Sequence, residues 1–304
     1  MIWAFSRRTI CLSICGGCDK RVDDMRKWFK KIPPLQRLVN NYRKYTLKKE
    51  KAKYFETFSK DCYGCFFGIF DTFEDALKAA PVTKPFGYNN AKLAREYSEM
   101  LATNRWERGI AGIRSYDYPV LYWLSHIFQL SQSKTFNIFD FGGNVGIHFV
   151  SFGKYLNYQA NLKWTVYDLP EIVKAGRSVQ TDDKLTFSTN FSDANGADIF
   201  FASGSIQYAL DIHSKVDGLS EKPKHIIINR LGLHERETIV TLQNGGPVFY
   251  PQYVFNKVWF IESFEAINYE LTDLWQDDLD GCHIPFHPEI SVPYYNGLYF
   301  RLRD

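Results

Sequence analysis

Residues Phe136–Gly146, FNIFDFGGNVG, combine an apolar run, an acid and a glycine-rich turn. The apolar run predicts a strand that is buried on both faces, and Val145–Tyr155 is expected to form the helix after the turn. Gly142, Gly143 and Gly146 would let the backbone approach a ligand closely, and the first helical turn offers free N–H groups. The stretch therefore predicts a strand–turn–helix corner that binds a nucleotide-like ligand.

Strands and helices alternate from this corner to the end of the chain. Strands are expected at Phe136–Phe141, Lys163–Asp168, Lys184–Thr189, Asp198–Ser203 and Lys224–Asn229. Helical segments lie between most of them, which is typical of a parallel, doubly wound sheet. Arg230–Gln252 receives no strand or helix, and a helix is expected at about Asn256–Ile267. Two final strands, Tyr269–Trp275 and Tyr294–Arg303, could pair as an antiparallel hairpin.

The 304 residues are expected to form three parts. Residues 1–57 would be a leader and a basic amphipathic helical segment, residues 58–132 a helical cap, and residues 133–304 the sheet domain. Helices of the cap are expected at Phe73–Ala80, Ala91–Thr103 and Tyr118–Leu130, with Cys62–Phe70 as a loop or short strand. Met25 could be the true start of the protein, which would remove the first three cysteines.

Positive charge is concentrated near the start of the chain. Lys20–Lys53 holds thirteen Lys/Arg against three Asp/Glu, although the whole chain carries only +3. After Pro34 the apolar residues Leu35, Leu38 and Tyr42 follow one helical face. Such a helix could contact an anionic membrane surface, through residues 20–53, or pack on the protein itself. Nucleic acid is not expected, since no reader motif accompanies the charge.

Membrane insertion and secretion are not expected either. The sequence contains no apolar run long enough to span a bilayer. Arg7 and Arg8 interrupt the mildly apolar start, where a signal peptide would need its apolar core. A cytoplasmic location is therefore expected, with peripheral contact at the inner face of the membrane as the variant that the basic segment suggests.

Two cysteine spacings match those of metal centres, but neither centre is expected in this protein. Cys11, Cys15 and Cys18 have the spacing with which radical enzymes hold an iron–sulfur cluster. No strand precedes this motif and no barrel pattern follows it. Cys62 and Cys65 could join two of these cysteines in a zinc site, but the basic helical segment between the pairs is longer than the usual zinc spacing.

The loop Asp140–Gly146 resembles the D-x-G-x-G-x-G loop of class I S-adenosylmethionine (SAM) methyltransferases, with Asn144 in place of the middle glycine. It fits the dinucleotide motif G-x-G-x-x-G poorly, because Phe141 stands where the first glycine belongs. Asp168 ends the second predicted strand, where a carboxylate can accept hydrogen bonds from both ribose hydroxyls. NAD enzymes place an acid there too, and Asp168 could instead cap the helix that begins near Glu171.

A closer resemblance is to methyltransferases of lipopolysaccharide and capsule biosynthesis loci, over roughly residues 58–304. It rests on Phe73–Ala76, Gly87-Tyr88, the DFGG loop, the sequence YDLP at Tyr167–Pro170, Ala202–Tyr208 and Asn229-Arg230. This resemblance implies a Rossmann-like, seven-stranded class I sheet with an N-terminal helical extension, and methyl transfer with SAM as the cofactor. O-methylation of a sugar or sugar precursor of a surface polysaccharide is the leading hypothesis for the acceptor. The cofactor contacts that the resemblance implies are Asp140, Gly142, Gly143, Asn144, Gly146, Asp168, Asn190, Ser203 and Gly204.

The residue that would remove a proton from the acceptor is open. The plant-type O-methyltransferases that the chain resembles have a histidine just after strand four, and Gln207 stands in that place here. Glutamine cannot take a proton, so the base is absent, elsewhere or not needed. His234, which follows strand five beside Glu235, is the preferred catalytic base, with a loop histidine as the alternative. Gln207 and Tyr208 are expected to position the acceptor.

Two further residues are assigned to ligand contacts. Arg230 could pair with a phosphate or carboxylate on the acceptor, or form an internal ion pair. His148, in the first turn after the glycine loop, could contact the amino-acid end of the cofactor. Alternatively, it could serve only to pack its helix against the rest of the protein. Two other functions remain open: a nicotinamide-dependent sugar-nucleotide oxidoreductase, and a non-catalytic SAM-fold scaffold in glycan assembly.

Overall fold

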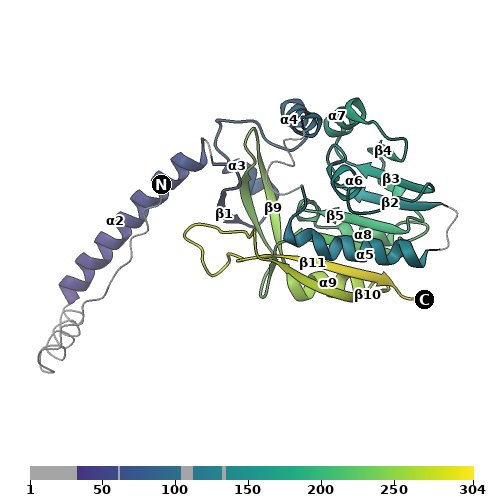
Figure 1. The fold of residues 1–304 in the computed structure, drawn as a ribbon. Helices are drawn as coiled ribbons and strands as arrows, with labels where there is room; N and C mark the ends of the chain where they lie inside the picture. Colours follow the sequence, from purple (N-terminus) through teal and green to yellow (C-terminus); the bar gives the residue numbers. More distant parts are fainter. Residues whose placement is uncertain (1–32, 61, 104–111, 132–134) are drawn as a thin grey trace, which may run out of the picture. The chain divides into compact units, whose positions relative to one another are not determined.

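The computed structural model describes residues 33–60, 62–103, 112–131 and 135–304 (Figure 1). Cys11, Cys15, Cys18, Met25 and the leader lie outside these residues. The chain divides into two units, residues 1–56 and residues 57–304. The described part of the first unit is helix α2, Pro33–Phe58, which confirms the helix expected after Pro34 and ends just inside the second unit. Leu38, Tyr42 and Tyr45 on α2 are exposed.

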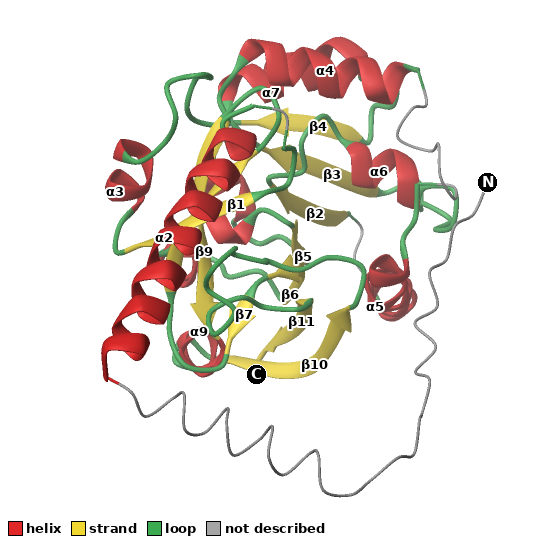
Figure 2. Cartoon of the chain, turned by 90° about the vertical axis from the view of Figure 1, so that its left-hand side faces the viewer, coloured by secondary structure: helices red, strands yellow, loops and turns green. Residues whose placement is uncertain are grey.

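A seven-stranded sheet organises the second unit. Its strands are β2 (Phe136–Phe141), β3 (Leu162–Tyr167), β4 (Leu185–Ser188), β5 (Ile199–Ser203), β6 (His225–Leu231), β10 (Tyr269–Asp277) and β11 (Tyr295–Leu302). They lie in the order β10-β11-β6-β5-β2-β3-β4, and Figure 2 shows them from β4 at the top to β10 at the bottom. Five strands are parallel, and β11 is antiparallel to both of its neighbours. This arrangement is the class I methyltransferase sheet, as the sequence predicted.

The predicted strands agree with the structure closely. β2 has the predicted bounds, and the bounds of the other four parallel strands differ by one or two residues. The last two strands pair as the predicted antiparallel hairpin, from Tyr269 opposite Leu302 to Asp277 opposite Tyr295. Each parallel strand is a short apolar run with a helix or turn on either side, which is the pattern of a strand buried on both faces.

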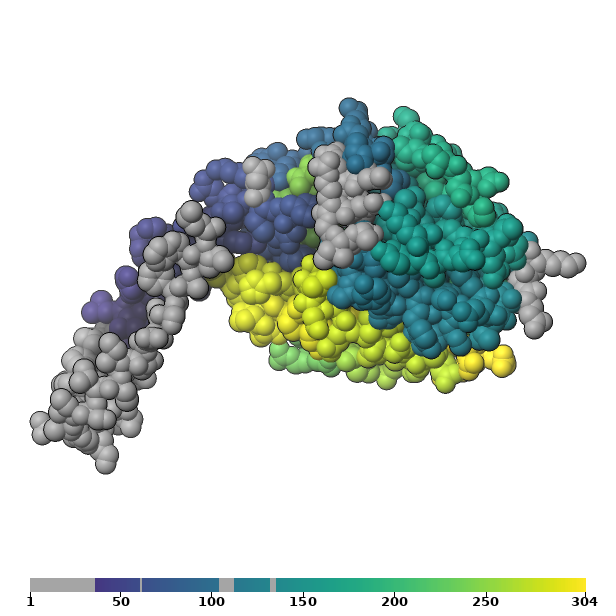
Figure 3. All heavy atoms as spheres, in the orientation of Figure 1, coloured from purple at the N-terminus to yellow at the C-terminus, as the bar shows by residue number. Residues whose placement is uncertain are grey.

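Apolar side chains cover both faces of the sheet. Ile138 and Phe201 face a core that contains residues of α5 (Tyr118–Leu130) and α6 (Ile147–Phe152). Their neighbours Phe139 and Phe200 face the opposite core, which contains residues of α8 (Ile212–Asp217) and α9 (Lys257–Glu265). The alternation follows from the two-residue period of a strand. Figure 3 shows α5 in blue on the surface beside the yellow C-terminal strands, where Trp123 Nε1 donates to Asp273 Oδ2 at 2.8 Å.

Short elements complete the second unit. The helices are α3 (Phe73–Lys78), α4 (Ala91–Ala102) and α7 (Pro170–Val179). Single 3-10 turns form at η2 (Ser115–Asp117), η3 (Phe191–Ala194) and η4 (Ile206–Tyr208). Thr72 caps α3 by accepting a hydrogen bond from the N–H of Asp75, as helix N-caps commonly do. The predicted helix after the glycine loop is shorter than expected, because α6 ends at Phe152.

A second, four-stranded sheet was not predicted. It consists of β1 (Phe66–Phe70), β8 (Ile239–Asn244), β9 (Phe249–Asn256) and β7 (Leu233–His234), in that order. β7 and β8 lie within Arg230–Gln252, where no strand is expected, and β9 begins there and runs on to Asn256. β1 lies within Cys62–Phe70, where a loop or short strand is expected. β8 and β9 are mostly buried on both faces, so their sequences lack the alternation that marks a half-exposed strand.

Candidate functional site

A cavity of about 630 Å³ lies at the carboxyl ends of the parallel strands. Residues that end or follow four neighbouring strands line it: Gly142 after β2, Asp168 after β3, Ser203 on β5 and Arg230 on β6. Loops at this edge of a doubly wound sheet are where ligands bind. The volume is within the range of small-molecule sites. The sheet therefore brings the glycine loop, Asp168 and Arg230 on β6 around one cavity.

Steric limits explain two glycines of the loop. Gly142 has φ = +68°, and a Cβ atom there would lie 2.4 Å from Cβ of Ser205. A Cβ atom on Gly143 would lie 2.4 Å from both Cγ and Oδ2 of Asp140, whose side chain is fully buried. Either side chain would overlap its neighbour, so the loop needs glycine at both positions. Asp140 and Gly143 support the loop and are not themselves part of the cavity lining.

Asn144 lies in the left-handed region with φ = +58°. Asparagine tolerates this conformation better than most residues, because its short polar side chain can bond locally. Its Oδ1 accepts a hydrogen bond from the N–H of Val145 at 2.8 Å, and its Nδ2 donates to the Tyr88 hydroxyl at 3.1 Å. Asn144 therefore replaces the usual glycine while it ties the loop to the segment before α4.

Asp168 lies directly after β3, in the cavity lining. Its Oδ2 accepts a hydrogen bond from the N–H of Asn144 at 2.9 Å, and its Oδ1 accepts one from the N–H of Leu169 at 2.7 Å. Burial raises the pKa of this carboxyl to about 7, although the two backbone donors oppose the rise. Each oxygen keeps a further lone pair, so the ionised carboxylate can accept two more donors from a ligand.

Asp117 is a cavity residue that the sequence analysis missed. Its Oδ2 accepts a hydrogen bond from the N–H of Arg114 at 3.0 Å, and its Oδ1 accepts one from Nδ2 of Asn229 at 3.3 Å. Burial raises the pKa of Asp117, while the Arg114 N–H and the nearby His148 and Arg230 oppose the rise. An acid directly before a helix usually suggests a cap, so this position carried no functional signal in the sequence.

His148 belongs to α6 and lines the same cavity. Its ring packs against Phe152 and Phe201 at centroid distances of 5.5 and 5.1 Å. Its buried Nδ1 lies 3.7 Å from Oδ2 of Asp140, and no described residue forms a hydrogen bond with it. His148 and Asp117 therefore offer an imidazole and a carboxylate on the side of the sheet that α5 and α6 cover.

Tyrosines form much of the remaining wall. The Tyr208 and Tyr250 rings meet edge to face at 5.4 Å, and Tyr88 lies 6.4 and 5.6 Å from them. Burial raises the pKa of all three hydroxyls, so they stay protonated and can donate hydrogen bonds. Gln207 lines the cavity beside them, and its buried Oε1 has no partner among the described residues. An acceptor atom without a donor suits a ligand hydroxyl.

Arg230 lines the cavity and already forms the internal ion pair that was one of its two expected roles. Its Nη2 lies 2.6 Å from Oδ2 of Asp280, and its Nε lies 3.9 Å from Oδ2 of Asp277. The guanidinium also lies over the Tyr116 ring, 4.8 Å from its centroid. Its backbone has φ = +58°, which is unusual for arginine and is typical of residues held by function or packing.

The structure does not bring His234 to the cavity. The histidine is buried, and its Nε2 lies 3.1 Å from the carbonyl oxygen of Glu289. Its Nδ1 accepts hydrogen bonds from the N–H groups of Arg236 and Glu237, both at 3.3 Å. Both ring nitrogens are therefore occupied in holding a turn, and His234 is in the wrong place for a base that acts in this cavity.

Other predicted cofactor residues also lie outside the cavity lining. Asn190 caps η3, where its Oδ1 accepts a hydrogen bond from the N–H of Ser192. Gly146, with φ = +86°, starts α6 and packs against Leu185, which a Cβ atom would approach to 2.8 Å. Gly204 and Ser203, by contrast, do line the cavity.

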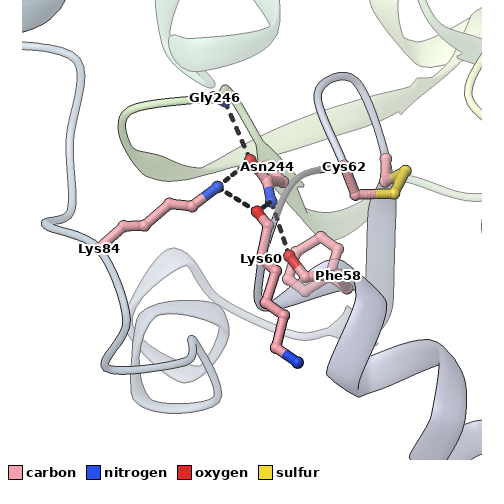
Figure 4. Close-up of a disulfide and its surroundings, with 7 residues drawn as sticks. Phe58, Lys60, Cys62, Lys84, Asn244 and Gly246 are labelled. Atoms are coloured by element: carbon pink, nitrogen blue, oxygen red, sulfur yellow. Dashed lines mark hydrogen bonds between the residues drawn. A yellow bond between two sulfur atoms is a disulfide. The ribbon is translucent and has the colours of Figure 1, made fainter.

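A disulfide joins Cys62 to Cys65, with their Cα atoms 5.5 Å apart. The two thiolates that the zinc alternative would need are therefore bonded to each other instead. Figure 4 shows how Asn244, at the end of β8, binds the segments beside the disulfide. Its Nδ2 donates to the carbonyl oxygens of Phe58 and Lys60, and its Oδ1 accepts a hydrogen bond from Lys84. The two residues between the cysteines, Tyr63 and Gly64, line the cavity.

Among the described residues, no group of three or more His, Cys, Asp or Glu side chains is arranged to hold a metal ion. No helix in the described part of the chain is both long and apolar enough to cross a membrane.

No protein-family model and no curated protein sequence matches the chain. Solved structures do match its fold at low sequence identity. A Burkholderia thailandensis 1,6-didemethyltoxoflavin-N1-methyltransferase with bound S-adenosylhomocysteine (SAH) is 14% identical, with a TM-score of 0.41, over 74% of this chain and 95% of its own. Human N-acetylserotonin methyltransferase in complex with SAM is 13% identical, with a TM-score of 0.43, over 71% and 58%. OxaC in complex with SAH and oxaline is 12% identical, with a TM-score of 0.45, over 76% and 54%.

Proposed function

We propose that this protein is a SAM-dependent methyltransferase that methylates a hydroxyl group of a small acceptor. The observation that carries the proposal is the placement of Asp168 after β3, hydrogen-bonded to the backbone of the glycine loop at the ligand-binding edge of a class I sheet. A buried carboxylate with two free lone pairs suits the two adjacent hydroxyls of a ribose.

The residues present fit both ends of the cofactor. Asp168 and the loop Gly142–Asn144 would hold the nucleoside, because they combine a carboxylate with closely approaching backbone. Asp117 and His148 would hold the amino-acid end, whose ammonium group suits a carboxylate and whose carboxylate suits an imidazole.

When bound, the cofactor supplies an activated methyl group on a sulfonium. The protein then has to align the acceptor oxygen with that methyl group and exclude water. Gln207 and Tyr208 would orient the acceptor, because both line the cavity. His234 is not proposed as a base, since both of its ring nitrogens are occupied outside the cavity.

Calorimetry with SAH and with NAD tests the cofactor. We expect SAH to bind and NAD not to bind, because the loop lacks the first glycine of the dinucleotide motif. NAD binding without SAH binding would instead support the nicotinamide-dependent oxidoreductase. A non-catalytic scaffold is separated by turnover: it would bind SAH but transfer no methyl group from SAM to a lysate glycan fraction.

The acceptor that we propose is a sugar or sugar precursor of a surface polysaccharide. The resemblance of the sequence to methyltransferases of polysaccharide biosynthesis loci supports it, as does the tyrosine- and glutamine-lined wall of the cavity. Mass spectrometry of surface glycans from cells with and without the gene would identify the product. We expect the mutant glycan to lack the mass of one methylene group per modified residue, and an unchanged glycan profile would reject this substrate.

We also propose peripheral contact with an anionic membrane through residues 20–53, from the cytoplasmic side. In the described part of this segment, α2 exposes Leu38, Tyr42 and Tyr45 among lysines and arginines, a combination that suits a lipid interface. Vesicles with and without anionic lipid would be sedimented with the full chain and with a variant that lacks residues 20–53. Equal sedimentation of both proteins would reject the contact.

A further inference from the structure

One face of the second sheet forms a wall of the cavity. Gln243 on β8 lies opposite Phe66 on β1 and Tyr250 on β9, so the three side chains share a face. Gln252 lies two residues after Tyr250 and therefore belongs to the same face. All four residues line the cavity. The wall thus combines two rings with two amide groups, and none of the four carries a charge.

The cations of the described lining are already paired with acids. Arg230 binds Asp280 at 2.6 Å, and Lys215 lies 3.7 Å from Oδ1 of Asp211. Asp117 adds a further acid to the same cavity. Sites for phosphate normally present an arginine, a lysine or a helix N-terminus that is free to bind it. A phosphate here would have to compete with Asp280 for Arg230.

Uncharged hydroxylated rings suit this wall. Amide groups donate and accept hydrogen bonds with hydroxyls, and aromatic rings pack against the apolar face of a sugar ring. Gln207, which also lines the cavity, adds a buried Oε1 without a partner among the described residues. Tyr208 and Tyr250 contribute hydroxyl groups that remain protonated.

We propose that the second sheet is the acceptor-binding wall, that the acceptor is an uncharged sugar-like ring, and that the Arg230–Asp280 pair excludes acceptors phosphorylated on that ring. The proposal rests on the proposed methyltransferase function and adds the chemical class of its acceptor. A phosphate carried at a distance, as on a lipid-linked saccharide, is compatible with it, because the cavity holds only the ring.

Saturation-transfer NMR in the presence of SAH tests the proposal, with methyl pyranosides and the matching sugar 6-phosphates as probes. The full-length protein is expected to bind the pyranosides in the millimolar range and to show no transfer to the phosphates. Gln243→Ala should weaken pyranoside binding about three- to tenfold, because one hydrogen bond to a hydroxyl is lost. Gln243→Asn should weaken it less, since an amide remains.

A second experiment removes the negative charge of Asp280 beside Arg230. Asp280→Asn leaves Arg230 without its closest acid, so the sugar phosphates are expected to bind at least about tenfold more tightly than to the wild type. Glu74→Gln, an exposed acid on α3, is the matched control and should change nothing. Tighter binding of phosphates than of pyranosides by the wild type, or no binding of either, would overturn the proposal.

SAH affinity, measured by calorimetry on every variant, separates failure of the proposed acceptor class from failure of the proposed methyltransferase function. Normal SAH binding shows that a variant is folded. SAH binding together with a preference for phosphates would reject only the acceptor class, whereas absence of SAH binding by the wild type would reject the proposed function itself.

Discussion

The proposed cofactor half of the cavity and its acceptor half are built from different kinds of chain segment. Asp140, the glycine loop and Asp168 lie within one strand–helix–strand unit, and backbone atoms of the loop bind the Asp168 carboxylate directly. The acceptor half brings together Tyr63, Gln207 and Gln243 from three distant parts of the chain. Local geometry therefore sets the first half, while packing of the second sheet against the first sets the other.

The largest effect is expected from Gly143→Ala. A Cβ atom at this position would lie 2.4 Å from the buried Asp140 carboxylate, so the loop must shift or the core must yield, at a cost of about 1–3 kcal/mol. We expect SAH affinity to fall at least about a hundredfold by calorimetry, since a loop shifted by an ångström no longer fits its ligand. Gly218→Ala is the control: its Cβ atom would meet only ordinary contacts, the nearest at 3.4 Å, and SAH affinity should stay as in the wild type.

Asp168 should make SAH binding depend on pH. The carboxylate accepts ribose hydroxyls only when ionised, and burial raises its pKa to about 7. Lowering the pH through 7 protonates it, so affinity should fall roughly tenfold between pH 8 and pH 6, as expected for one titrating group. Asp168→Asn should bind about ten- to a hundredfold more weakly at pH 8 and lose this pH dependence. Calorimetry at both pH values checks this, and a wild-type affinity that is flat with pH would contradict the assignment.

Asp117 lies outside the strand–helix–strand unit of the glycine loop. Its substitution tests whether the cofactor half includes residues from elsewhere in the chain. If its carboxylate holds the ammonium group, Asp117→Asn should weaken SAH binding about five- to twentyfold. Binding of 5′-methylthioadenosine, which lacks the amino-acid end, should not change. An equal loss for both ligands in calorimetry would mean that Asp117 supports the fold of the cavity and not the ammonium group.

The smallest effect on SAH is expected from the disulfide. Cys62→Ser with Cys65→Ser frees the loop that carries Tyr63, on the acceptor side, and leaves the glycine loop untouched. Closing so short a loop stabilises the fold by at most about 2 kcal/mol, so the melting temperature should drop by a few degrees. SAH affinity should remain at the wild-type value, and a large loss would show that the two halves are coupled.

Helix α2 and the Cys62–Cys65 pair differ in how much of their structure the local sequence predicts. The helical face from Leu35 to Tyr42 predicted α2 correctly, because a 3.6-residue period is a local property. For Cys62 and Cys65 the sequence suggested only a share in a zinc site that was not expected to form, and the disulfide between them was not predicted, because joining two sulfur atoms depends on how the folded backbone places them.

The sequence by itself determined the seven-stranded sheet, the glycine loop and Asp168. Each of these depends on residues that are neighbours along the chain: β2 is an apolar run, and the glycines and the acid directly follow their strands. The same local patterns predicted the order of strands and helices, and the class I resemblance followed from them.

Only the tertiary structure decided the second sheet, the surroundings of Asp117 and the place of His234. β8 is mostly buried on both faces and pairs with β1 from far earlier in the chain, so its short apolar run carries no period that marks it as a strand. Asp117 looks like a helix cap until Asn229 and His148 are brought beside it. His234 follows β6, where a base was expected, but it lies outside the cavity lining and both of its ring nitrogens bind backbone groups. Contacts between distant segments depend on how the elements pack, and a local pattern does not encode that packing.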